Sequence, residues 1–182
     1  MVLGKGDLRH PARSSKLEVI GRHLMNLMMK DFNFLAIGRL SDGEIAVRVR
    51  ETCPEDFLRG YVPVYKFDVL LADTETIIGS VDLRIGDTDH LALYAGHIGY
   101  GIEPEYRGNR YAAKACILIK QAALAHGFKT LWITCNPDNQ ASRRTCEILG
   151  AHFVEIVDLP EYTDMYQKGE RQKCRYRWNL KV

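Results

Sequence analysis

The stretch Glu103-Pro104-Glu105-Tyr106-Arg107-Gly108-Asn109-Arg110-Tyr111-Ala112 decides the fold of this 182-residue chain, because it joins an apolar, strand-like run to a long helical pattern. The first amides of a helix have no partner within the helix, and the positive end of the helix dipole lies beside them. Arg107 and Arg110 add two positive charges at the same place. Each of these features favours an anion, so the turn predicts a phosphate-binding site, and a diphosphate is the expected ligand.

Apolar periodicity on both sides of this turn predicts the surrounding elements. A strand, a helix and a strand follow one another across it, and this order predicts a right-handed crossover with two parallel strands. Glycines inside the run that leads to the turn indicate a bulge or a place where something approaches the backbone closely. The pattern predicts strands at 45–49, 65–71, 77–85, 91–102, 131–135, 153–159 and 174–180, helices at 112–126 and 139–150, and a brief helix at 54–56.

The segment 1–43 is predicted to be a helical extension packed on a single domain that spans 44–182. Ser15 and Glu18 form a predicted capping box, and apolar residues recur after them at helical spacing. A long loop at 160–173 separates the last two predicted strands, and loops of this length are often functional.

Composition and charge narrow the class of protein. Hydrophobic residues make up 46% of the chain and charged residues 26%, which is enough apolar material for a real core. The net charge is +2 and no dense run of Lys and Arg is present, so we expect no nucleic-acid partner. Five cysteines without C-x-x-C spacing indicate buried thiols in a reducing compartment and no metal site. We see no signal peptide and no apolar run of about 20 residues, so we expect a cytoplasmic protein without a membrane partner.

Two segments carry a resemblance to a known family. Y-G-I-E-P-E-Y-R-G-N-R-Y-A and N-P-D-N-Q-A-S-R-R-T-C-E-I-L-G-A, in this order of elements, resemble the GNAT superfamily of N-acetyltransferases. The likeness covers Ile45 to the C-terminus. It implies an α/β (α+β) fold with a mixed, mostly antiparallel sheet, a central parallel strand pair splayed to admit CoA, and flanking helices. It also implies acetyl-CoA as cosubstrate and no metal.

The resemblance assigns the cosubstrate site. The family's phosphate turn falls on 107–112, with Arg110 where the family usually has glycine. If the backbone there is already helical, Arg110 adds a cation to the phosphates; if it needs a positive φ, the arginine is strained and the assignment weakens. Asn139 and Ser142 match the family's N-x-x-S helix start; the alternative is that Asp138 or Asn139 simply caps the helix. The expected acetyl-CoA contacts are Tyr100, Gly101, Ile102, Arg107, Gly108, Asn109, Arg110, Tyr111, Ala112, Asn139 and Ser142.

Catalysis by the family's route needs a proton acceptor, because amines with a pKa of about 10.4 are mostly protonated at neutral pH. We expect His97 to be this base, with Tyr94 and Glu103 as weaker alternatives and a core histidine as the structural alternative. Cys146 stands where many relatives carry the tyrosine that protonates the departing thiolate, so it is the expected acid; a small core cysteine is the alternative.

The expected function is transfer of an acetyl group to a primary amine by direct attack. The sequence leaves open which amine is the acceptor, a small molecule or a protein amine, and whether the chain forms a homodimer. Glu161, Asp164 and Glu170 in the 160–173 loop would attract a cationic amine. A non-catalytic acyl-CoA sensor is the rival from another class, and an enzyme that takes acyl groups from a carrier protein is a further one.

Overall fold

The computed structural model describes residues 32–181. The chain divides into two units, Met1–Asn33 and Phe34–Val182, and the second unit contains all the elements below. The predicted helix that follows Ser15 lies outside the described residues. In the described residues, no helix is long and apolar enough to cross a membrane.

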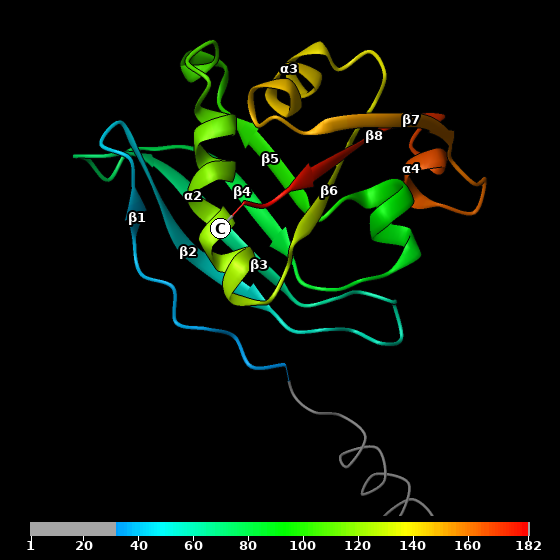
Figure 1. The fold of residues 1–182 in the computed structure, drawn as a ribbon, viewed down its shortest axis with the longest axis horizontal. Helices are drawn as coiled ribbons and strands as arrows, with labels where there is room; N and C mark the ends of the chain where they lie inside the picture. The colour runs from blue at the N-terminus through cyan, green and yellow to red at the C-terminus, as the bar shows by residue number, and fades with distance from the viewer. Residues whose placement is uncertain (1–31, 182) are drawn as a thin grey trace, which may run out of the picture. The chain divides into compact units, whose positions relative to one another are not determined.

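Five antiparallel strands form the larger sheet, in the order β1-β2-β3-β4-β5. One face of this sheet carries the core, because alternate residues such as Tyr65, Phe67, Val81 and Leu83 are completely buried. Helix α2 (Tyr111–Ala125) packs against it with a face that includes Ala115 and Ile119 (Figure 1). The strands are β1 (Leu40–Ser41), β2 (Ile45–Cys53), β3 (Val64–Leu71), β4 (Ile77–Arg84) and β5 (Ile98–Ile102).

Three antiparallel strands form the smaller sheet, in the order β6-β8-β7. The strands are β6 (Thr130–Cys135), β7 (His152–Asp158) and β8 (Gln172–Asn179), and two helices, α3 (Gln140–Ile148) and α4 (Asp164–Gln167), connect them. From β5 onward the predicted strands and helices follow in the expected order, and the predicted 160–173 loop contains the short helix α4.

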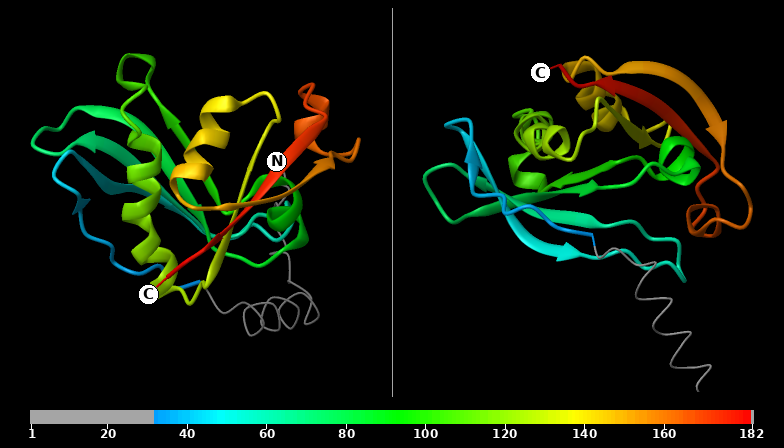
Figure 2. Two further views of the ribbon diagram at one scale, coloured as in Figure 1. Left: turned by 45° about the horizontal axis from the view of Figure 1, so that its top comes forward. Right: turned by 60° about the horizontal axis from the view of Figure 1, so that its bottom comes forward.

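The two sheets meet at one point, which we call the apex and define by Gly96, His97 and Trp132. His97 N–H donates to Trp132 O at 2.7 Å, and Gly96 has a φ of +69° so close to β6 that a Cβ there would lie 3.1 Å from Thr134 N. Beyond the apex β5 and β6 share no ladder, and they separate toward α3 (Figures 1 and 2). The predicted splayed parallel pair is confirmed.

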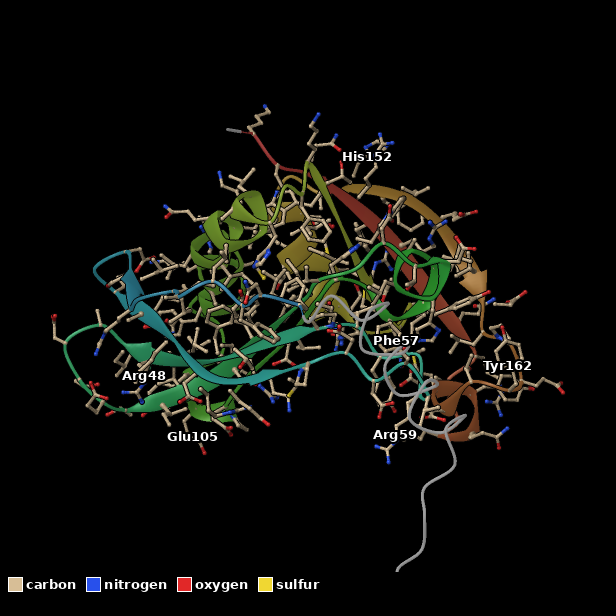
Figure 3. All side chains as sticks on the ribbon, turned by 90° about the horizontal axis from the view of Figure 1, so that it is seen from below. Arg48, Phe57, Arg59, Glu105, His152 and Tyr162 are labelled. Carbon is tan, nitrogen blue, oxygen red and sulfur yellow. The ribbon has the colours of Figure 1, made fainter. Side chains whose placement is uncertain are left out.

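Two details differ from the predictions. The first half of the predicted strand at 91–102 is a π-helical turn, η1 (Leu91–Ala95), which ends at Gly96 because only a positive φ lets the chain turn into β5. The predicted brief helix at 54–56 is wrong: this segment is part of a tight loop closed by mutual hydrogen bonds between Asp56 and Tyr61. Phe57 in this loop is 65% exposed and points outward (Figure 3).

Candidate active site

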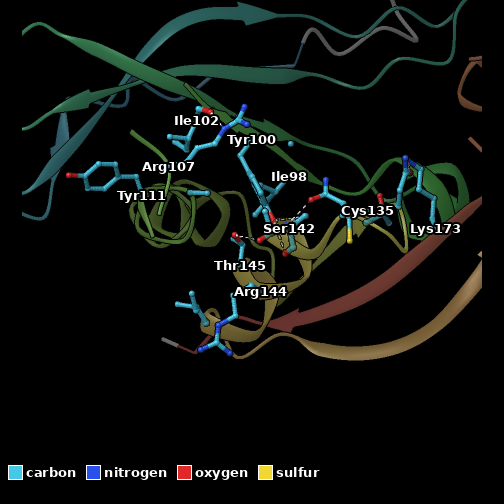
Figure 4. Close-up of a pocket in the computed structure, with 18 of the residues that line it drawn as sticks. Ile98, Tyr100, Ile102, Arg107, Tyr111, Cys135, Ser142, Arg144, Thr145 and Lys173 are labelled. Atoms are coloured by element: carbon cyan, nitrogen blue, oxygen red, sulfur yellow. Dashed lines mark hydrogen bonds between the residues drawn. The ribbon is translucent and has the colours of Figure 1, made fainter. Parts of the chain in front are cut away.

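A cavity of about 700 Å³ lies in the gap between β5 and β6. Figure 4 shows Arg107 and Tyr111 at one side of it, Tyr100 and Ser142 in the middle, and Cys135 and Lys173 at the other side. We call the first side the α2 end. The other side is the η1 end, lined by Arg84, Tyr94, Met165, Glu170 and Lys173. All the expected acetyl-CoA contacts except Asn109 line this cavity.

At the α2 end, the structure provides donors for an anion. The backbone amides from Gly108 to Ala112 have no acceptor among the described residues, and they lie at the start of α2. Arg107 is exposed, and its Nε donates to Ile102 O at 2.9 Å, which leaves its two terminal nitrogens available. Asn109 uses its side chain within the turn, where Nδ2 donates to Tyr106 O at 3.2 Å. This end therefore fits a diphosphate.

Arg110, which stands where the family usually has glycine, has a left-handed backbone. Its φ is +61° and its ψ is 18°, and it is the only residue other than glycine with a positive φ in the described part of the chain. The alternative of an already helical backbone is therefore wrong. An L side chain in this conformation costs roughly 1–2 kcal/mol, and such strain is found where a site needs a particular backbone path.

Strand β5 presents part of its backbone to the cavity. Glu103 N donates to Ile78 O and Arg84 N to His97 O, and pairing alternates along an antiparallel ladder. Gly101 consequently bonds to β4, whereas Tyr100 and Ile102 direct their N–H and C=O groups away from β4 and toward the gap, where the Ile102 carbonyl accepts from Arg107 Nε. Of the three β5 residues expected to contact the cosubstrate, these two offer backbone groups and Gly101 lines the wall.

The start of α3 closes the cavity from the opposite side. Asn139 caps the helix, with its Oδ1 accepting from Ser142 N at 3.0 Å. Ser142 Oγ in turn lies 2.9 Å from the hydroxyl of Tyr100, so a hydrogen bond ties β5 to α3 across the gap. Both readings of Asn139 hold at once, because the capping residue also lines the cavity.

His97 belongs to the apex and does not line the cavity. It is 2% exposed; Trp132 N–H donates to its Nδ1 at 2.9 Å, so Nε2 carries the proton and donates to Gly86 O at 3.0 Å. Burial lowers the pKa of the imidazole, which keeps this ring neutral. Both nitrogens are used for structure, and this geometry supports the core alternative rather than a catalytic base.

Cys146 does not line the cavity, although its thiol lies near the hydroxyl of Tyr100, which does. Its side chain is completely buried in α3, and burial raises the pKa of the thiol to about 12. A group this weakly acidic donates a proton poorly to a thiolate whose own pKa is about 8.5. The packing alternative therefore accounts for Cys146 better than the acid role.

The η1 end holds three charged side chains, of which the sequence analysis named only Glu170; Lys173 and Arg84 were not expected there. Lys173 is 8% exposed; its Nζ donates to Asn136 Oδ1 at 2.7 Å and forms a short ion pair with Glu170. Of the three loop carboxylates expected to attract a cationic amine, Glu170 alone lines the cavity. Tyr162, in the same loop, points into solvent (Figure 3). Arg84 reaches the cavity from the end of β4.

Comparison with models of protein families identifies the family of this chain. A family model described as "Acetyltransferase (GNAT) domain" matches residues 28–152. The chain belongs to the GNAT acetyltransferase family. Membership in it makes acyl transfer the class of reaction and acetyl-CoA the cosubstrate, and the cavity has the donors that this cosubstrate needs. No curated protein matches the chain significantly.

Solved GNAT structures share the fold at low sequence identity. The ribosomal-protein-S5-alanine acetyltransferase of Vibrio fischeri aligns with a TM-score of 0.58 at 14% identity, over 79% of this chain and 97% of that one. A probable GNAT acetyltransferase of Chromobacterium violaceum aligns with a TM-score of 0.56 at 12% identity, over 96% and 97%. The microcin C7 self-immunity acetyltransferase MccE, in complex with acetyl-CoA and AMP, aligns with a TM-score of 0.50 at 20% identity. This last alignment covers 64% of this chain and 61% of the MccE chain.

Proposed function

We propose that this chain transfers an acetyl group from acetyl-CoA to a primary amine by direct attack. The observation that carries the proposal is the single cavity that joins free amides at the α2 end to the unpaired backbone of β5 and then to the charged η1 end. A diphosphate at α2 and a pantetheine arm along β5 would bring the thioester toward the η1 end. The proposed contacts are those expected from the sequence, without a direct role for Asn109.

In the proposed step the amine nitrogen bonds to the thioester carbonyl carbon and the carbon–sulfur bond breaks. The acetyl group ends on nitrogen, CoA leaves as a thiolate that takes up a proton, and the attacking amine loses one. A backbone amide of β5 that faces the gap would stabilise the charge that develops on the carbonyl oxygen. Such an amide works without reorganisation, because the β4 ladder already holds the strand in place.

Glu170 is the proton acceptor that this geometry supports. It is the only carboxylate among the described residues that line the cavity, and it forms an ion pair with Lys173. His97 offers no free nitrogen for this role. The solved neighbours include enzymes named for the N-terminal serine of L7/L12 and for an alanine of protein S5. A protein α-amine and a small-molecule amine are therefore both within the proposed class.

Calorimetric titration of acetyl-CoA tests the cosubstrate part of the proposal. We expect saturable binding that weakens about tenfold in Arg107→Ala, because one charge-assisted contact is worth about 1.4 kcal/mol or more. Arg59→Ala is the matched control, since Arg59 is an exposed arginine in the β2–β3 loop outside the cavity. Release of free CoA thiol in the presence of an amine panel then tests turnover. A folded protein that gives no heat with acetyl-CoA refutes the proposal, and binding without CoA release from any amine favours a sensor.

A further inference from the structure

Arg84 stands out at the η1 end because its charge has no counter-ion. Its guanidinium makes one hydrogen bond among the described residues, a long one of 3.3 Å from Nη1 to Gly96 O, and it forms no ion pair with a described carboxylate. Asp82, two residues earlier on the same face of β4, acts on it only from a distance. Burial makes the charged form of Arg84 costly and lowers its pKa, although arginine stays protonated.

Each of the other cationic side chains of the cavity has a carboxylate partner or lies where the phosphates of the cosubstrate are proposed to bind. Lys173 is paired with Glu170 at the η1 end. Arg144 is paired with Glu147 in α3, at 2.7 Å between Nη1 and Oε2. Arg107 and Arg110 lie by the start of α2, where the phosphates of the cosubstrate are proposed to bind. Arg84 is therefore the one cavity cation, within the described residues, that neither a protein carboxylate nor the proposed cosubstrate neutralises.

The backbone next to Arg84 leaves room for its side chain over β5. Gly99 lies opposite Asp82 in the ladder, and a Cβ at this position would lie 3.3 Å from Arg84 Nη2. The guanidinium thus extends from Gly96 to Gly99 along the wall of the cavity. A planar fork of donors in this position suits a carboxylate or a phosphate, which it can bind with two hydrogen bonds.

We propose that Arg84 binds an anionic group of the acceptor, so that the substrate is a primary amine that also carries a carboxylate or a phosphate. This inference rests on the proposed function and names its substrate class. The anion would lie against Arg84 and Gly99, and the amine would face Glu170 across the η1 end. A purely cationic amine, which the acidic residues of the 160–173 loop suggested, is disfavoured by the charge of Arg84, which would repel it and would stay without a counter-ion.

Pairs of acceptors that differ only in the anion test this proposal. One arm compares amino acids with their carboxamides, and the other compares amino-sugar phosphates with the free amino sugars. For wild-type protein we expect the anionic member of one arm to have the higher kcat/KM, and the arm that shows it identifies carboxylate or phosphate. Arg84→Gln should lower kcat/KM for that acceptor about 10- to 100-fold, mainly through KM, and change the neutral partner little. Arg84→Lys should restore part of the loss.

Arg48→Gln is the matched control, because Arg48 is a strand arginine paired with Glu75 outside the cavity. Calorimetry with acetyl-CoA runs beside the kinetics, and Arg84→Gln should bind it as wild type does. Wild-type turnover without a preference for the anionic members overturns this inference alone. If Arg84→Gln lowers kcat/KM equally for both members of a pair, the inference is also overturned. Arg84 then has only the structural role of its hydrogen bond to the Gly96 carbonyl. Absence of acetyl-CoA binding by the wild type instead overturns the proposed function and this inference with it.

Discussion

Substitution of Arg110 separates the strain of its backbone from the effect of its charge. Glycine and alanine at this position both remove the guanidinium, but only glycine accepts a φ of +61° without a steric penalty. Relief of the left-handed conformation is worth roughly 1–2 kcal/mol, and the greater freedom of glycine in the unfolded chain offsets about 0.4–1 kcal/mol of it. We therefore expect Arg110→Gly to be more stable than Arg110→Ala by roughly 1 kcal/mol.

Thermal and urea unfolding of the two variants and the wild type measure this difference. For a chain of this size, 1 kcal/mol corresponds to a shift of about 2–4 °C in Tm. Wild type and Arg110→Ala should unfold at similar temperatures, because both carry the strain and the side chain is exposed. Both variants should bind acetyl-CoA more weakly by a similar factor, about two- to fivefold at low salt, since an exposed charge contributes up to about 1 kcal/mol. If Arg110→Gly is no more stable than Arg110→Ala, the backbone at this position is not left-handed and the strain argument fails.

Three further substitutions test the roles assigned to other residues. Burial lowers the pKa of His97 in the folded protein, so between the folded and unfolded pKa values the unfolded chain binds a proton that the folded protein does not. The contribution of neutral His97 to stability is therefore complete above a pH of about 6.5 and is lost as the pH falls below that value. His97→Gln should therefore be less stable at pH 8 and show a shallower decline between pH 7 and 5 in urea titrations, and an unchanged slope would contradict the neutral apex histidine. Glu170→Gln should lower kcat at pH 7 by about 100-fold or more if Glu170 accepts the proton, and recover as pH rises toward the pKa of the amine; wild-type kcat in this variant excludes the role. Cys146→Ala should cost about 1 kcal/mol in stability through lost packing and leave kcat within about twofold, whereas a large fall in kcat with an unshifted Tm would restore Cys146 as the acid.

Local patterns predicted the site where its residues lie close together in sequence. The phosphate turn, the cap at Asn139 and the crossover through α2 each depend on a short run of residues, and the structure brings them to one cavity. Arg107 and Ser142 line it as expected. Hydrogen bonding over a few residues fixes these features, so an isolated sequence contains the necessary information.

Residues whose roles depend on distant partners were not predictable in the same way. The role of His97 is set by the main chain of Trp132, 35 residues away, and by the carbonyl of Gly86. Arg84 falls within the predicted strand at 77–85 and was assigned no role, because nothing near it in the sequence shows that Gly99 leaves space for its side chain. Glu170 was expected as one of three loop carboxylates, and only the fold of the loop selects it. Alternation along β4 and the glycines of β5 together were the available signal for Arg84.

The apex acts as the fulcrum of a lever. Two hydrogen bonds join His97 to Trp132 there, and beyond them β5 and β6 run on with no ladder between them. Four residues of strand span about 13 Å, so a rotation of about 5° at the fulcrum changes the width of the gap at the far end by about 1 Å. A methyl group at Gly96 would lie 3.1 Å from Thr134 N, and it would push β5 and β6 apart at the apex itself. The width available to a bound thioester is therefore set by atoms that the thioester does not touch.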